Sequence, residues 1–463
     1  MTEQLTRNQR RALGVTALAV LIGVVIAVVP GHRGWFDVGV YHGAVNHWVG
    51  GGDLYEWTTT NGYGFTYPPF AAVCMLPMTL LAWYPTIAVS LAMTVVASGF
   101  VLHLLVDPLA RRAGWSRWFA FALAACLFAA LNPVRDTVSF GQVNLLLLAL
   151  VYVDLWLLER GHPLAGIGTG LAAAIKLTPA VFIGYLLITR RWRAAGVAAG
   201  TAAAATAGTA LLAPDASRRY FFEALLDTDR VGKLAYVSNQ SLMGLVARLH
   251  PAHPDRLLWL VLVAGVLVVW LVRVRQAGRV GDDRAGFALT GIVGCLVSPV
   301  TWVHHLVWLA PALVVLADST LPWPPSDLHL RRRLGLGVAG YLVLVSGVVW
   351  VWANGGGDAV ALVGGNLYVL IALGLLIGLP VAGGGYPDTA ERAGHAGSAS
   401  AECADGRAAG GPSRRIGAGS ASGGGSALGT VRGSSAASPA RVATTISRSV
   451  RTSGRRSGRD QIV

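Results

Sequence analysis

The residues of this chain that could do chemistry begin with an aspartate that follows a long apolar stretch. Asp37 comes shortly after residues 12–29, which are apolar and numerous enough to cross a bilayer. A carboxylate at the membrane surface can meet both a lipid headgroup and water. Asp37 could therefore take a proton from a hydroxyl group that attacks a lipid-linked substrate. The alternative is that Asp37 only caps the start of a surface helix.

Two cations lie beside or within apolar segments. Lys176 interrupts an apolar run, and Arg135 follows another, close to Asp136. A charge in such a run costs about 2.5–3.5 kcal/mol on insertion scales, so it needs a partner. A phosphate group is a natural partner for Arg or Lys, and we expect Arg135 and Lys176 to bind a donor phosphate. An internal ion pair, for example between Arg135 and Asp136, is the other interpretation.

Amide side chains gather in two of the predicted outer loops. Gln142 and Asn144 lie close to Arg135, and Asn239 and Gln240 belong to a polar run in a later loop. Amides both donate and accept hydrogen bonds, which suits the hydroxyl groups of a sugar. We expect all four to bind substrate, although a capping and turn role explains Asn239 equally well.

His304 and His305 form an adjacent pair at an outer helix end. Either could bind phosphate or sugar, or assist in proton transfer. The pair offers too few ligands for a metal, and the four cysteines are too scattered for a metal site or a disulfide framework. Asp227 and Asp229 have the spacing that holds a metal on a nucleotide sugar, but two acids at this spacing are common by chance. We expect neither a metal nor a cofactor.

Composition shows what must position these residues. The 463 residues are 54% hydrophobic and 13% charged, with the apolar residues in repeated long runs. This pattern predicts an all-α polytopic membrane protein. The net charge of +14 comes mostly from arginines at predicted inner ends and in the tail, so nucleic acid is not an expected partner. Arg7, Arg10 and Arg11 precede the first span, which places residues 1–11 in the cytoplasm and Asp37 outside.

Charges and apolar runs together predict about twelve crossings within residues 12–382. The first outer loop covers residues 30–67 and a large outer loop covers residues 214–255. Two short helices should meet near Lys176, with Pro179 supplying the break. Residues 383–463 are rich in Gly, Ser and Arg, which predicts a disordered cytoplasmic tail.

The residues after Asp37 follow helical spacing. Val40, Tyr41, Ala44 and Val45 recur on one face. We interpret the segment as an amphipathic helix that lies on the outer membrane surface.

An ordered set of motifs resembles a known family. Asp37-Val-Gly-Val-Tyr41, Leu54-Tyr55 and Tyr67-Pro-Pro69 are similar to the first outer loop of actinobacterial polyprenol-phosphate-mannose-dependent α-(1→2)-mannosyltransferases. Later motifs are similar too, over about residues 12–380: Gly141-Gln-Val-Asn144, Lys176-Leu-Thr-Pro179, Asn239-Gln-Ser241 and His304-His305.

The resemblance implies the GT-C glycosyltransferase fold, with juxtamembrane helices on the outer face. It also implies that Asp37 is the catalytic aspartate, that His304 or His305 is an essential histidine, and that Tyr41 and Tyr67 contact substrate. The donor would be polyprenyl-phosphate-mannose, and the acceptor a mannosylated lipid of the phosphatidylinositol mannoside or lipomannan type. The reaction would take place on the extracytoplasmic face of the plasma membrane.

Two alternatives stay open. Intramembrane charges and broken helices also suit a transporter or lipid flippase, although such a protein needs its polar residues at mid-membrane. A related enzyme could instead transfer arabinose or glucose from a similar donor.

Overall fold

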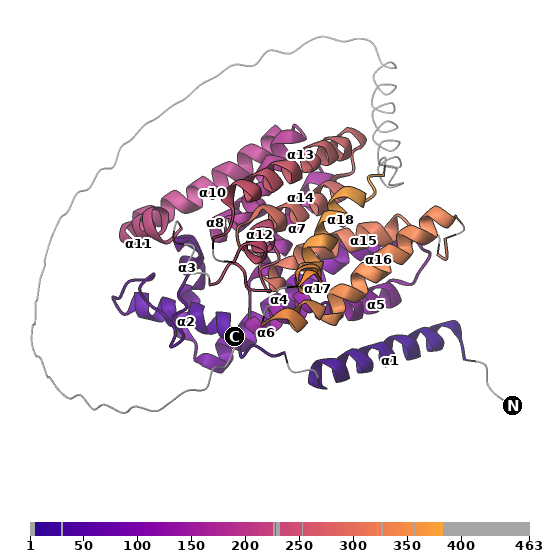
Figure 1. The fold of residues 1–463 in the computed structure, drawn as a ribbon, viewed down its shortest axis with the longest axis horizontal. Helices are drawn as coiled ribbons and strands as arrows, with labels where there is room; N and C mark the ends of the chain where they lie inside the picture. Colours follow the sequence, from indigo (N-terminus) through magenta and orange to yellow (C-terminus); the bar gives the residue numbers. More distant parts are fainter. Residues whose placement is uncertain are drawn as a thin grey trace, which may run out of the picture. The chain divides into compact units, whose positions relative to one another are not determined.

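A computed structural model describes residues 5–28, 31–225, 227, 232–251, 253–321, 323–325, 327–354 and 358–382. Within these ranges the regular structure is helical, apart from two isolated β-bridges (Figure 1). The predicted all-α class is confirmed. The predicted tail, residues 383–463, lies outside the described residues, as do Asp229 and its immediate neighbours.

The first half of the chain forms ten α-helices, of which the last is rich in alanine. They are α1 (Arg7–Val28), α2 (Phe36–Val49), α3 (Pro69–Met75), α4 (Trp83–Arg112), α5 (Arg117–Ala130), α6 (Asn132–Phe140), α7 (Asn144–Glu159), α8 (Ile167–Ile175), α9 (Val181–Ile188) and α10 (Trp192–Leu212). The second half continues with α11 (Pro214–Arg219), α12 (Leu242–Leu249), α13 (Arg256–Val280), α14 (Asp283–Val297), α15 (Ala310–Asp318), α16 (Leu328–Ser346), α17 (Ala359–Gly365) and α18 (Leu367–Gly378). Short 3-10 or π-helical turns occupy η1 (Leu76–Leu80), η2 (Thr178–Ala180), η3 (Tyr220–Ala224), η5 (Val303–Leu309) and η6 (Val348–Trp352).

Several helices have the length and composition of membrane spans. Four of the described helices, α1, α4, α10 and α13, are long and apolar enough to cross a bilayer. Two bent pairs, α5 with α6 and α17 with α18, raise this number to as many as six. The chain is therefore a multi-pass membrane protein. The count of about twelve crossings stays a prediction, because it relies on shorter helices such as α8, α9 and α15.

The helix that begins beside Asp37 forms as predicted, but its apolar face does not lie free on a membrane surface. Val40, Tyr41, Ala44 and Val45 of α2 are buried. They belong to a small core that α3 and the first-loop residues complete, with α2 packed on α3, α4 and α6 (Figure 1). The predicted helix is confirmed, but its apolar face is covered by protein, because the rest of the first loop folds back over it.

The predicted helix break lies at Lys176. Helix α8 ends at Ile175, Lys176 adopts extended backbone angles, and Pro179 lies in the short turn before α9. Asp154 of the neighbouring α7 accepts hydrogen bonds from the backbone N–H groups of Gly168 and Thr169, at 3.1 and 2.5 Å. This buried carboxylate satisfies donors that the start of a helix leaves open, and so fixes the helix that delivers Lys176.

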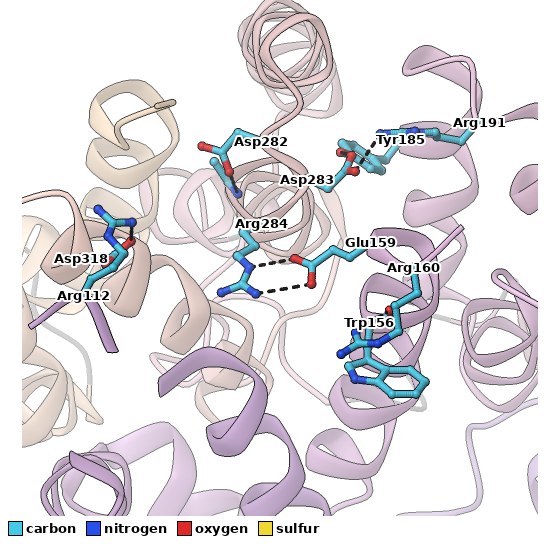
Figure 2. Close-up of polar contacts among 11 residues, drawn as sticks. Arg112, Trp156, Glu159, Arg160, Tyr185, Arg191, Asp282, Asp283, Arg284 and Asp318 are labelled. Carbon is cyan, nitrogen blue, oxygen red and sulfur yellow. Dashed lines mark hydrogen bonds and ion pairs between the residues drawn. The ribbon is translucent and has the colours of Figure 1, made fainter. Parts of the chain in front are cut away.

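Charged side chains are paired at the far end of α7. This 16-residue helix spans about 24 Å, from Asn144 to Glu159. Around its end Arg284 binds Glu159, at 2.8 Å, and Arg191 binds Asp283, which also accepts a hydrogen bond from Tyr185 (Figure 2). Residues expected on the inner side are thus brought together, well away from Asn144.

We predict that Gly168 is required for the packing of α8 on α7. A Cβ atom at Gly168 would lie 2.0 Å from the backbone oxygen of Leu150, whereas nothing lies within 4 Å of one at Gly196. Gly168→Ala should lower the free energy of unfolding by about 1–3 kcal/mol, because backbone would have to move. Gly196→Ala is the matched control and should be neutral or slightly stabilising. Thermal unfolding in detergent checks both, and an equal midpoint for the two variants would contradict the packing described here.

Candidate active site

Asp37 lies in the first turn of α2 without acting as its cap. The capping position is Trp35, which has left-handed backbone angles (φ 59°), and no side chain makes a capping hydrogen bond there. The Oδ2 atom of Asp37 is buried and has no hydrogen-bond partner among the described residues. Burial raises the pKa of Asp37 to about 7, although Gln142 and the charge of Lys176 act in the opposite direction. This carboxyl group is suited to exchanging a proton near neutral pH.

A glycine allows the start of α2, which carries Asp37, to lie close to the turn between α6 and α7. Gly141 ends α6 with a φ of +72°, and a Cβ atom there would lie 2.1 Å from the Cγ2 atom of Val38. The Trp35 N–H also donates to the backbone oxygen of Ser139, at 3.0 Å. Only glycine allows both this turn and this approach. The start of α2 is therefore held against the turn that carries Gln142.

Two tyrosines and an amide form a buried cluster next to Asp37. Tyr67 donates from its hydroxyl group to Oε1 of Gln142, at 2.8 Å. The Tyr41 hydroxyl lies 3.1 Å from both the Tyr67 hydroxyl and Oε1 of Gln142. These uncharged groups place oriented dipoles beside the carboxylate, and all three side chains are buried.

Lys176 extends this cluster to Asn144 and His305. Its ammonium group lies 3.2 Å from Oδ1 of Asn144, 3.4 Å from the Tyr67 hydroxyl and 2.8 Å from Nε2 of His305. Nδ1 of His305 accepts a hydrogen bond from the Trp302 N–H at 3.1 Å. The break after α8, the start of α7 and η5 thus deliver one polar side chain each.

His304 lies next to this cluster but has a different environment. Its backbone oxygen accepts hydrogen bonds from Thr137 and Asn144. Both ring nitrogens are buried and have no partner among the described residues, while the ring packs edge-on against Phe140, with centroids 5.1 Å apart. His304 therefore has hydrogen-bonding capacity that the protein itself does not use.

Three of the predicted substrate or phosphate contacts form side-chain hydrogen bonds to backbone groups alone. Arg135 donates from Nη2 to the backbone oxygen of Val345. Asn239 is fully buried and bonds the backbone of Leu234, Pro299 and Thr301.

Gln240 is also fully buried, and its amide nitrogen donates to the backbone oxygens of Val237 and Gly365. Both amides thus hold loop backbone, while Oε1 of Gln240 is buried without a hydrogen-bond partner among the described residues. The expected sugar contacts of Asn239 and Gln240 stay a prediction. The sequence could not distinguish the two roles, since both use the same groups.

Comparison with known proteins shows the family of the chain. Residues 65–299 match the family described as glycosyltransferase family 87. The chain belongs to this family. The resemblance stated from the motifs is confirmed, and the protein is a membrane glycosyltransferase.

Several curated relatives support the assignment. A polyprenol-phosphate-mannose-dependent α-(1-2)-phosphatidylinositol mannoside mannosyltransferase of Mycobacterium tuberculosis is 32% identical over 364 residues, which are 72% of this chain and 82% of the relative. The protein of the same name from Mycolicibacterium smegmatis is 35% identical over 307 residues, 62% and 68% of the two chains. A phosphatidylinositol pentamannoside mannosyltransferase of the latter organism is 32% identical over 339 residues, 70% and 78%. No solved structure matches the chain.

We predict that the transfer rate of this glycosyltransferase follows the ionisation of Asp37. The carboxyl group acts as a base only when deprotonated, so kcat/KM should rise with pH through a midpoint at about 7 and then level off. Because the charge of Lys176 lowers the pKa of Asp37, Lys176→Gln should move the midpoint to higher pH. Initial rates measured against pH for both proteins test this. A pH-independent rate, or a midpoint that moves downward in the variant, would contradict it.

Proposed function

We propose that the protein transfers mannose from polyprenyl-phosphate-mannose to a mannosylated phosphatidylinositol-type lipid, and that an α-(1→2) linkage forms. The observation that carries this proposal is the buried Oδ2 atom of Asp37, which has no hydrogen-bond partner among the described residues and lies beside a cluster of hydroxyl, amide and amine groups. The names of the curated relatives supply the donor and the acceptor class. The arginines before α1 support an active site on the extracytoplasmic face of the plasma membrane.

Asp37 would act as the general base. An acceptor hydroxyl group transfers its proton to the carboxylate while its oxygen bonds to the anomeric carbon of the donor. The bond from that carbon to the phosphate oxygen breaks, and the lipid phosphate leaves with the electron pair. A single displacement inverts a β-linked donor to an α-linked product. A proton acceptor with a pKa near neutral pH fits this step.

Lys176 would stabilise the departing phosphate. Its ammonium group lies within hydrogen-bond distance of Asn144, Tyr67 and His305, which bring no formal negative charge when His305 and Tyr67 are neutral. Its positive charge therefore remains available to an anion that enters the cluster. Arg135 is a weaker candidate, because it already donates to Val345. Tyr41, Gln142 and Asn144 would orient the sugars.

We predict that Asp37→Asn abolishes transfer. Asparagine keeps the shape but accepts no proton, and loss of a general base costs about 10²–10⁴-fold in rate. Asp53→Asn is the matched control in the same loop, because Asp53 is engaged by Arg219 at 2.8 Å. Purified variants would be assayed with radiolabelled polyprenyl-phosphate-mannose and a panel of mannosylated lipids. Near-normal turnover by folded Asp37→Asn protein would contradict the role of Asp37 as the base. Transfer of arabinose or glucose in preference to mannose would contradict the proposed donor.

We also predict that transfer needs no divalent metal. The donor carries one phosphate rather than a diphosphate, and Lys176 supplies a cation at the cluster. Activity in excess EDTA should equal activity with added magnesium or manganese. If activity were lost in EDTA and restored by either metal, the prediction would be wrong, and Asp227 and Asp229 would become candidate metal ligands.

A further inference from the structure

Arg33 is a cation that lies beside the active-site cluster. No motif in the sequence distinguishes it. It precedes α2 by a short turn and lies four positions before Asp37. Its side chain forms no hydrogen bond or ion pair with any described residue, and its Nε atom is buried without a partner. An arginine in such a place has five N–H donors that are free to bind a ligand.

Two aromatic rings hold the guanidinium group in place. Its central carbon lies 4.5 Å from the ring centre of Trp350 and 5.6 Å from that of Phe140. Contacts between a guanidinium and the faces of aromatic rings stabilise the charge without using its N–H groups. The rings therefore position Arg33 and leave its donors in the plane of the group available.

The polar neighbours of Arg33 also have unused atoms. Asp136 and His304 are each close enough to interact electrostatically with Arg33. Oδ2 of Asp136 and both ring nitrogens of His304 are buried without hydrogen-bond partners among the described residues. Asp136 is 4% exposed and His304 is also 4% exposed. Leaving so many buried polar atoms unpaired costs free energy, which a bound ligand would recover.

The three side chains together have the chemistry for a phosphate next to hydroxyl groups. The planar guanidinium can hold two phosphate oxygens at once, and a protonated nitrogen of His304 can donate to a third. The carboxylate of Asp136 would repel a bare phosphate, but it accepts hydrogen bonds from hydroxyl groups. A ligand that carries both groups fits all three residues.

We propose that Arg33, His304 and Asp136 bind the phosphate ester of a lipid substrate together with a hydroxyl group of the attached sugar or polyol. This inference rests on the proposed function and deepens it. The same chemistry is present in the mannosyl phosphate of a polyprenyl donor and in the inositol phosphate of a phosphatidylinositol-type acceptor. Lys176 differs from Arg33, because its amine already donates to Asn144 and lies 2.8 Å from Nε2 of His305.

A binding experiment with each lipid alone separates the two sources, because no transfer can take place. The full-length protein and its Arg33→Gln variant in nanodiscs would be titrated with three probes: polyprenyl-phosphate-mannose, sugar-free polyprenyl phosphate and a phosphatidylinositol mannoside. The variant should bind one class of lipid about 10-fold more weakly or worse, since a hydrogen bond to a charged group is lost. Loss for both polyprenyl probes assigns the site to the donor, and loss for the phosphatidylinositol mannoside assigns it to the acceptor.

The matched control is Arg218→Gln, which removes an exposed arginine of α11 and should leave the affinity for every probe within about 2-fold. If Arg33→Gln does not fold, Arg33→Lys keeps the charge but not the planar fork, and should weaken binding of the same lipid class. Unchanged affinity for all three probes in a folded Arg33 variant would overturn the proposal. Failure of the proposed function has a different signature: the wild-type protein would bind the mannosylated donor no better than sugar-free polyprenyl phosphate.

Discussion

The active site depends on burying one oxygen of a carboxylate without pairing that carboxylate directly to a cation. Asp37 has a buried oxygen with no hydrogen-bond partner among the residues that the structure describes, and the positive charge of Lys176 lowers its pKa less than burial raises it. A direct ion pair would hold the pKa of Asp37 low and make it a weak base. The hydroxyl group of Tyr67 bonds both the amide of Gln142 and the ammonium group of Lys176, so neutral groups lie between the two charges. Burial therefore still raises the pKa of Asp37 to about 7.

The helices around this site can be understood as its supports. Gly141 permits the close approach of α2 to the turn before α7, and the buried Asp154 fixes the start of the helix that ends at Lys176. Helix α8 ends at Ile175, and Lys176 follows it with extended backbone angles, which direct its side chain differently from a helical residue. The ion pairs around Glu159 and Asp283 lie at the other end of α7. They lie where no chemistry is proposed, whereas polar atoms near the Asn144 end of α7 have no hydrogen-bond partner among the described residues.

Much of this organisation could be predicted from the sequence. The spans, the helix at Asp37 and the break near Lys176 follow from local patterns, since apolar runs, helical spacing and proline act over a few residues. The convergence of Tyr41, Tyr67, Gln142, Asn144, Lys176 and His305 could be expected only from the family's motifs.

The remaining features depend on contacts between distant segments. The burial of α2 by its own loop has no local signature. A turn role for Asn239 could be expected, but its bonds to Pro299 and Thr301, 60 and 62 residues away, could not. Arg33 could not be singled out from the sequence, because an arginine next to a membrane span is common. Its contacts with Phe140 and Trp350, which are distant in the sequence, are what show that it is held in place.

The most direct test of the account is a structure of Asp37→Asn protein with an intact mannosyl donor and an acceptor lipid bound together. The account predicts the acceptor hydroxyl oxygen within about 3.2 Å of the residue 37 side chain, on the side of the anomeric carbon opposite the phosphate. The phosphate itself should contact Lys176 or Arg33. An acceptor hydroxyl far from residue 37, or the donor phosphate bound directly against it, would contradict the role of Asp37 as the base.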